Sequence, residues 1–240
     1  MIFPNFTSRL VLESGADFMV HGIYKYNFFG KELWITTTTI STWTVSIILI
    51  IFALFARRTM LKASEVPGTF QNIIEMMVEA FEGMTSGILG SNAYRFINYI
   101  GTIFLFILLS NLSGLLGLRN PTGDYAVTFL LGMVTFFIVH YQGFKNRRLR
   151  HITVLFEPTP LLSPLNIIGE LANPLSISLR LFANVLSGVI MMGLWYSMMP
   201  LWAKIGIPAF LHVYTDVFSG CIQTYVFCML TMVYIDDKMS

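Results

Sequence analysis

Long apolar stretches separated by short polar segments dominate the sequence. Five of them are close to or beyond the ~20 residues that a helix needs to cross a bilayer. These stretches are residues 33–56, 96–118, 125–144, 161–203 and 205–235. The pattern predicts an all-α integral membrane protein, folded as a single membrane domain with five transmembrane segments.

The last two stretches are too long to stand upright in a membrane. At ~1.5 Å per residue, a helix over 161–203 would measure ~65 Å, whereas the hydrocarbon layer is only ~30 Å thick. These segments must tilt, break or extend beyond the membrane, and Pro174 and Pro208 are candidate break points. We expect a long tilted helical hairpin with a turn near residues 204–208. Such a hairpin suits wrapping around a neighbouring object.

Residues 67–90 differ from the apolar stretches because they alternate polar and apolar positions with the period of a helix. The pattern predicts an amphipathic helix on the membrane surface, with Pro67 in its first turn. Its polar face is acidic, so it could contact a protein partner or simply lie at the interface. The polar face carries Gln71, Glu75, Glu79 and Glu82, and the apolar face carries Phe70, Ile73, Ile74, Met77, Phe81 and Met84.

The basic residues predict the orientation of the chain. Most of them fall on one side of the predicted crossings, which the positive-inside rule makes the cytoplasmic side. The N-terminus is therefore expected outside and the C-terminus inside. The residues on this inner side are Arg57, Arg58, Lys62, Arg95, Lys145, Arg147, Arg148, Arg150 and Lys238, and those on the other side are Arg9, Lys25, Lys31, Arg119 and Lys204.

Composition supports the membrane assignment and narrows the function. The chain is 55% hydrophobic and 12% charged, whereas soluble domains usually carry ~25% charged residues. A net charge of +2 with no basic patch argues against nucleic acid as a partner. Cys221 and Cys228 are two helical turns apart, too far for a disulfide.

Arg180 is a permanent cation inside the fourth apolar stretch. Arginine cannot lose its proton in a protein, and at a bilayer centre it costs at least ~2.5–3.5 kcal/mol. Helical spacing places it in a polar stripe that begins at Asn173, with Glu170 one turn before that residue, and the last stretch carries a second stripe. The first stripe is Asn173, Ser176, Arg180, Asn184 and Ser187, and the second is His212, Asp216, Ser219, Gly220 and Gln223.

These polar residues can also have purely structural roles. Asn, Ser and Gln in membrane helices often only hydrogen-bond to a neighbouring helix, and His140 and His212 are more typical of interfacial or helix-contacting positions. Arg180 could form a buried ion pair with Asp216. Ionisable groups inside a membrane nevertheless mark ion pathways by default, so transport is the favoured hypothesis.

Several motifs resemble subunit a of the membrane sector of F-type ATP synthases, in its bacterial form. The stretch LANPLSISLRLFANVLSG is similar to the signature helix of that family, whose Leu-Arg-Leu-Phe-(Gly/Ala)-Asn pattern is met by residues 179–184. CIQTYVFCMLTMVYI resembles its final helix, with Gln223 at the glutamine position. FILLSNLSGLLGLRNPTGDYAVT is similar to its central crossings. The resemblance covers roughly residues 35–240.

This resemblance implies an ion-conducting stator subunit in a bacterial plasma membrane. The expected partners are a rotating ring of c subunits, the b subunits of the peripheral stalk and the remaining ATP synthase subunits. Arg180 is expected between two offset half-channels, where it meets each ring carboxylate in its ionised form. The carried ion would be H⁺ or Na⁺, and we expect no cofactor, no bound metal and no catalytic site on this chain.

Elementary electrostatics agrees with this role. A ring carboxylate exposed to lipid must be neutral, because a bare buried charge is too costly. Beside a permanent cation its charged form is favoured, so it releases its ion there. At an effective dielectric constant of 20, charges 4 Å apart attract by about 4 kcal/mol. The membrane potential adds ~2.3 kcal/mol per charge for each 100 mV.

The resemblance also suggests roles for the other stripe residues. Asn184 and Gln223 would support the arginine or line the path, Glu170 would belong to the cytoplasmic half-channel, and His212 and Asp216 would line the outer one. Asn173 and Ser176 complete the candidates for ion translocation. Some family members carry a glutamate nine residues after the arginine, where this chain has Val189, and a histidine where it has Asp216. Relative to those members, this chain therefore carries the carboxylate on its last helix and not on the helix of the arginine.

Two other function classes are alternatives. A secondary transporter or antiporter predicts inverted repeats and matched broken helices, and the sequence has neither. A lipid-modifying membrane enzyme needs acidic or histidine clusters facing one substrate. The acidic pair in YIDDKM, residues 234–239, reads as a solvated tail. The chain has no phosphate-binding loop, so nucleotide chemistry is expected on other subunits.

Overall fold

The computed structural model describes residues 22–28, 31–63, 68–147, 163–200 and 206–239. Five helical segments in this part are long and apolar enough to cross a membrane: Thr37–Met60, Thr69–Leu116, Tyr125–Asn146, Asn166–Met198 and Ile207–Met239. The prediction of an all-α integral membrane protein is therefore confirmed. Arg9, Pro67, Arg148, Arg150 and Lys204, which entered the sequence predictions, lie outside the described residues.

A small β-hairpin precedes the first long helix and was not anticipated. Strands β1 (Gly22–Phe28) and β2 (Lys31–Thr36) pair antiparallel, with Tyr26 opposite Leu33. Helix α2 (Thr37–Met60) consequently begins at Thr37 rather than at residue 33. The side chain of Thr36 caps it, because its Oγ1 accepts a hydrogen bond from the backbone N–H of Thr39 at 3.3 Å.

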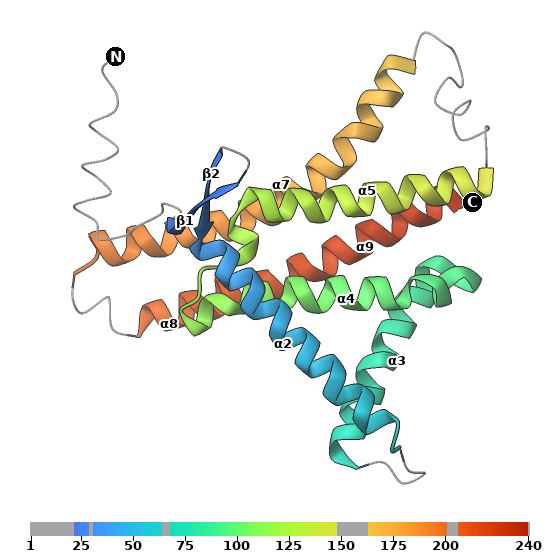
Figure 1. The fold of residues 1–240 in the computed structure, drawn as a ribbon, viewed down its shortest axis with the longest axis horizontal. Coiled ribbons are helices and arrows are strands. Elements are labelled where there is room, and N and C mark those ends of the chain that lie inside the picture. Colours follow the sequence, from blue (N-terminus) through green and yellow to red (C-terminus); the bar gives the residue numbers. More distant parts are fainter. Residues whose placement is uncertain (1–21, 29–30, 64–67, 148–162, 201–205, 240) are drawn as a thin grey trace.

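Helix α2 lies obliquely across the molecule and keeps most of its apolar side chains exposed (Figure 1). Near its end it meets α3 (Thr69–Leu89), where the rings of Phe55 and Phe70 pack 4.9 Å apart. The amphipathic helix predicted around α3 is present. Its Ile74 is buried, while Glu79 and Glu82 face outward.

Short helices connect the long ones. The one-turn helix η1 (Gly90–Asn92) leads from α3 into α4 (Ala93–Leu112). The short helices η2 (Ser113–Leu116) and η3 (Pro121–Gly123) then lead into α5 (Tyr125–Arg147).

Four helices surround the core. Helices α4, α5 and α9 run side by side (Figure 1). Buried side chains from α4, α5, α7 and α9 fill the space between them, led by Ile100, Ile107, Leu181, Phe227 and Met232.

The predicted hairpin of the last two long helices is present. Helix α7 (Ser163–Met198) contains Pro174 and changes direction along its length (Figure 1). Proline lacks the N–H that would bond the carbonyl of residue 170, which permits this bend. Residues 201–205 of the connection lie outside the described part.

The return arm of the hairpin is interrupted rather than uniform. It begins at Gly206, whose φ of 87° suits glycine, and continues as α8 (Ile207–His212) with Pro208 in the first turn. A π-helix, η7 (Val213–Phe218), follows before α9 (Ser219–Met239). Such π segments in α-helices frequently occur at functional sites.

Candidate ion-translocation site

The polar stripe of α7 lies on the border between the buried and the exposed side of the helix. Ser176, Arg180 and Ser187 are exposed, whereas Asn173 and Asn184 are half-buried against neighbouring helices. Within the part of the chain that the structure describes, no hydrogen bond or ion pair joins the Arg180 guanidinium to another residue. The fixed charge therefore faces away from its own protein.

The apolar surroundings of Arg180 make this exposure informative. Leu175 and Leu179, close to it along α7, are 42% and 48% exposed, and Ile190 and Leu194 are exposed further along the helix. A membrane or another protein must cover such a surface. In either environment an unneutralised guanidinium is costly, so a counter-charge is expected from outside the chain.

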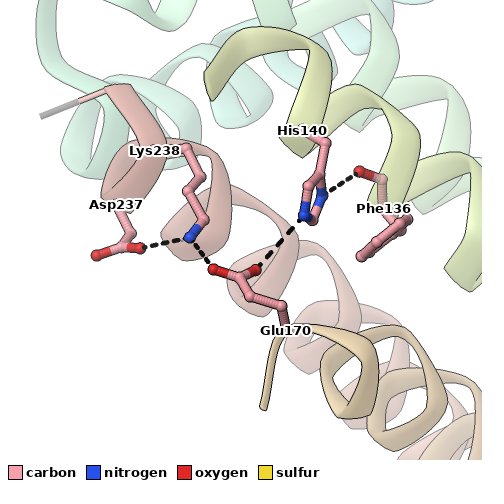
Figure 2. A network of polar contacts seen from close by, with 5 residues as sticks. All are labelled: Phe136, His140, Glu170, Asp237 and Lys238. Carbon is pink, nitrogen blue, oxygen red and sulfur yellow. Dashed lines mark hydrogen bonds and ion pairs between the residues drawn. The ribbon is translucent and has the colours of Figure 1, made fainter. Parts of the chain in front are cut away.

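One group of charged side chains gathers where α5, α7 and the end of α9 meet. We call it the C-terminal cluster: His140, Glu170, Asp237 and Lys238. Figure 2 shows the Glu170 carboxylate between the other two helices. Lys238 Nζ donates a hydrogen bond to Glu170 Oε1, and His140 Nε2 lies 3.6 Å from Glu170 Oε2. Lys238 Nζ is also 3.7 Å from an Asp237 oxygen.

The C-terminal cluster borders a cavity of about 280 Å³. Asn173 and Pro174 of α7 also line this cavity, together with Tyr234 of α9. The bend at Pro174 and the close packing of α5 on α7 shape this region, since a Cβ added to Gly132 would lie 2.8 Å from the Pro174 carbonyl oxygen. The space is large enough for several water molecules.

A second polar group forms where the π-helix packs on α7. We call it the π-helix cluster: Asn184, His212, Thr215, Asp216 and Ser219. The two Asp216 oxygens accept hydrogen bonds from His212 Nδ1 at 2.8 Å and from Thr215 Oγ1 at 3.0 Å. Ser219 Oγ donates to Asn184 Oδ1 at 2.8 Å, which joins α9 to α7.

The space in the π-helix cluster is much smaller than that in the C-terminal cluster. Asn184, Asp216 and Thr215 border a cavity of about 10 Å³, together with Gly188, Gly220, Asn111, Asn120 and Val185. This volume is close to the minimum that one water molecule needs. A Cβ added to Gly188 would lie 3.4 Å from the Thr215 Cβ, an ordinary van der Waals distance, so the π-helix packs directly against α7 here.

Buried hydrogen bonds from α4 brace the start of α9. Asn111 is 2% exposed, and its Nδ2 donates to the Gly220 carbonyl at 3.1 Å. Thr122 of η3 donates to Asn111 Oδ1 at 2.7 Å. Thr224 Oγ1 also donates to the Gly220 carbonyl, at 2.8 Å. Since every partner is buried, this network fixes the helix directly behind the π-helix cluster.

The structure thus separates the sequence-predicted candidates into distinct places. Glu170 and Asn173 belong to the region of the C-terminal cluster, and His212, Asp216 and Asn184 form the π-helix cluster. Ser176 and Arg180 lie on the exposed side between them. Gln223 is buried, at 9% exposure, one turn beyond Ser219 on α9.

Two interpretations made from the sequence need correction. The possible ion pair between Arg180 and Asp216 is not formed: the Asp216 carboxylate accepts hydrogen bonds from His212 and Thr215, and Arg180 lies on the exposed side of α7. The end of α9 is not simply a solvated tail, because Lys238 is only 13% exposed and pairs with Glu170. His140 and Lys238 were missed as site residues, and no periodic pattern could reveal them, since they meet Glu170 only through the packing of three helices.

Comparison with known proteins agrees with these features. The sequence profile of the family described as ATP synthase A chain matches residues 39–236. The chain is 34% identical over 239 residues to "ATP synthase subunit a, sodium ion specific" of Propionigenium modestum, covering 92% of this chain and 78% of that protein. It is 34% identical over 203 residues to "ATP synthase subunit a" of Moorella thermoacetica, covering 84% and 89%.

A third relative, "ATP synthase subunit a 2" of Syntrophotalea carbinolica, is 35% identical over 199 residues, which cover 81% of this chain and 82% of that protein. The matched region of the family profile extends from α2 almost to the end of α9. The relatives are bacterial, and five membrane-type helices make the chain a multi-pass membrane protein. The chain belongs to the ATP synthase subunit a family, the ion-translocating stator subunits of the membrane sector.

Proposed function

We propose that this chain forms two offset ion paths of the membrane sector and supplies, in Arg180, the cation that discharges ring carboxylates between them. The observation that carries the proposal is an exposed arginine with no partner in the described part of the chain, set in an apolar helix face between two polar clusters. Family membership favours this role over a secondary transporter or a lipid-modifying enzyme.

The spacing of the clusters along α7 supports two separate paths. Glu170 precedes Arg180 by ten residues and Asn184 follows it by four, so the two flanking groups are ~21 Å apart along a helix that rises ~1.5 Å per residue. An ion that used both paths would have to travel between them on another carrier. A ring of c subunits, each with one carboxylate, is the carrier that we propose.

Arg180 couples the two paths through the charge of that carboxylate. In lipid the carboxylate must hold its ion, whereas beside Arg180 its ionised form is stabilised. An attraction of about 4 kcal/mol at 4 Å is large enough to favour ion release and small enough to be reversed as the ring advances. The cation also repels ions that would cross directly from one path to the other.

We assign the C-terminal cluster to the cytoplasmic path and the π-helix cluster to the outer path. The assignment rests on the inward bias of the basic residues, which puts the end of α9 in the cytoplasm and the N-terminus outside. The bacterial relatives favour a bacterial plasma membrane, where we expect the b subunits of the peripheral stalk to hold the chain beside the ring. Nucleotide chemistry belongs to other subunits.

Replacement of Arg180 tests the proposal. We expect Arg180→Ala to lower ion-driven ATP synthesis in membrane vesicles by roughly 1,000-fold, the equivalent of about 4 kcal/mol at 1.4 kcal/mol per factor of ten. The complex should still assemble, because the guanidinium bonds to none of the described residues. Arg95→Ala, which removes an exposed arginine from α4, is the matched control. Synthesis at the wild-type rate in Arg180→Ala would refute the role.

The carried ion is tested separately. One relative is described as sodium ion specific, and the chemistry of H⁺ and Na⁺ release at Arg180 is the same. ATP synthesis driven by an imposed sodium gradient, with and without a protonophore, distinguishes the two. Synthesis that survives the protonophore identifies Na⁺, and synthesis that is abolished identifies H⁺.

A further inference from the structure

A cavity outside the ion-translocation site lies where the end of α2 meets the start of α3 (Figure 1). Its volume is about 760 Å³, and residues from the end of α2 and from the first turn of α3 line it. The rings of Phe55 and Phe70, 4.9 Å apart, join the two helices beside it. None of the described residues that we assign to ion translocation borders this cavity, so it needs a separate explanation.

One side of the cavity is cationic. Arg58 and Lys62 both line it, four residues apart at the end of α2. In the described part of the chain, the side chains of Arg58 and Lys62 form no hydrogen bond or ion pair. Like charges at this spacing repel each other. An anion held between them would relieve that repulsion, so the cavity suits a negatively charged ligand.

The acidic residues of α3 lie away from this cationic side. Glu75 is not among the described residues that line the cavity, and its Oε1 accepts a hydrogen bond from Gln71 Nε2 at 2.8 Å. Glu79 and Glu82 lie further along α3 and face outward. The described lining of the cavity therefore carries two positive charges and no carboxylate.

Other parts of the lining are apolar. Leu61 and Phe70 border the cavity, and Leu61 is 75% exposed. The exposed side chains of Leu54 and Phe55 extend the apolar surface along α2, within the segment Thr37–Met60 that is apolar enough to cross a membrane. A ligand that fits both parts of the lining has an anionic end and an apolar end.

We propose that this cavity binds an anionic phospholipid, with its phosphate between Arg58 and Lys62 and its acyl chains along the apolar surface of α2. A guanidinium binds two phosphate oxygens at once, and an ammonium adds a compact charge. The hydroxyl of Thr69 also lines the cavity and can donate to a headgroup oxygen. Basic pockets between membrane helices bind anionic headgroups in this way. The site goes beyond the proposed function and does not depend on the role of Arg180.

The test uses the purified ATP synthase complex in phosphatidylcholine liposomes. A phosphatidylglycerol probe with a diazirine near its headgroup is added in rising mole fraction, and mass spectrometry after illumination identifies the labelled peptides. We expect saturable label on peptides that contain Phe55 or Phe70, because these side chains lie beside or within the cavity lining. Unlabelled phosphatidylglycerol should displace the probe. A phosphatidylcholine probe should give no saturable label there.

Charge-removing variants distinguish a defined site from a general attraction to anionic lipid. Arg58→Gln and Lys62→Gln should each raise the half-saturating mole fraction of the probe by roughly tenfold, because each removes a charged hydrogen-bond donor. Arg57→Gln is the matched control, since Arg57 is exposed on the next position of α2 but does not line the cavity. It should change half-saturation by no more than about threefold, as expected for an exposed charge.

Three results would overturn the proposal. Equal shifts in Arg57→Gln and Arg58→Gln would show a general surface attraction and no defined site. Displacement of the probe by inorganic phosphate would assign the cavity to a free phosphate. Absence of saturable label in the wild type would refute the site even if a variant failed to assemble. Arg180→Ala should label like the wild type, so the lipid site and the stator role can fail independently.

Discussion

The two polar clusters of α7 are built in different ways. The C-terminal cluster combines a carboxylate, an ammonium and an imidazole around a cavity of about 280 Å³. The π-helix cluster sets one carboxylate among hydroxyls, amides and an imidazole around about 10 Å³. The contrast teaches that the two ion paths we propose need not share a chemistry, because a wide cavity can hold water while a narrow one must supply polar ligands from its own side chains.

The two clusters are also held in place by different contacts. The C-terminal cluster depends on the packing of three helix ends, at the bend of α7 and at the close approach of Gly132 to Pro174. The π-helix cluster depends on a change of helical pitch and on the buried Asn111 network behind it. A substitution that disturbs the contacts around one cluster should therefore leave ion transfer at the other cluster intact. Mutagenesis can test this difference.

The largest effect on one cluster alone is expected from Asp216→Asn. Asp216 supplies the carboxylate of the π-helix cluster, and a positioned group that relays protons contributes ~100-fold or more to a rate. ATP synthesis driven from the outer face should fall by about that factor and lose its dependence on outer pH. Glu82→Gln removes an exposed carboxylate from α3 and serves as the control. Unchanged synthesis across outer pH would remove Asp216 from the path.

A smaller and purely structural effect is expected from Asn111→Ala. The change leaves the Thr122 hydroxyl and the Gly220 carbonyl each without one buried partner, at a cost of roughly 1–3 kcal/mol. Thermal stability of the purified complex should fall, and outer-face ion uptake should slow while ion uptake from the inner face is preserved. Altered uptake from the inner face with normal outer uptake would contradict the separation of the two clusters.

Gly132→Ala disturbs the packing of α5 on α7 that supports the C-terminal cluster. The new Cβ would meet the Pro174 carbonyl oxygen at 2.8 Å and the Ser178 Cβ at 3.3 Å, so α5 and α7 must move apart at a cost of about 1–3 kcal/mol. Ion uptake from the inner face should slow, with outer uptake unchanged. Gly169→Ala on α7, where an added Cβ meets nothing within 4 Å, is the matched control. Equal responses of the two variants would show that this packing does not shape the cluster.

The smallest effect is expected from Ser219→Ala. One hydrogen bond to Asn184 is lost, which is worth about 0.5–1.5 kcal/mol. Outer-face uptake should slow by roughly three- to tenfold, at 1.4 kcal/mol per factor of ten. Ser197→Ala removes a hydroxyl that bonds only within α7 and should have no such effect. A loss as large as that of Asp216→Asn would mean that Ser219 itself handles the ion.

The sequence predicted the features that depend on periodicity and length. The five apolar segments, the amphipathic α3, the hairpin of the last two long helices and the position of Arg180 on a polar stripe all follow from the spacing of side chains along one helix. The border position of that stripe could not be predicted, because it depends on which side of α7 the other helices cover.

Features that depend on contacts between distant segments, or on small changes of helical pitch, were missed. Lys238 and His140 lie 68 and 30 residues from Glu170 in the sequence, and only the packing of α5, α7 and α9 brings them together. The π-helix at Val213–Phe218 could not be predicted, because six residues are too few for a change of helical pitch to register in the periodicity of apolar positions. The β-hairpin before α2 lies at the edge of an apolar stretch that spacing alone assigned to a helix.

The most direct test of the central claim is a high-resolution structure of the whole membrane sector. It should place the Arg180 guanidinium within ~4 Å of a carboxylate from a c subunit, the distance of an ion pair. The two clusters should open to opposite sides of the membrane. A guanidinium bound instead to a group of its own chain, with no carboxylate from another subunit in reach, would contradict the account.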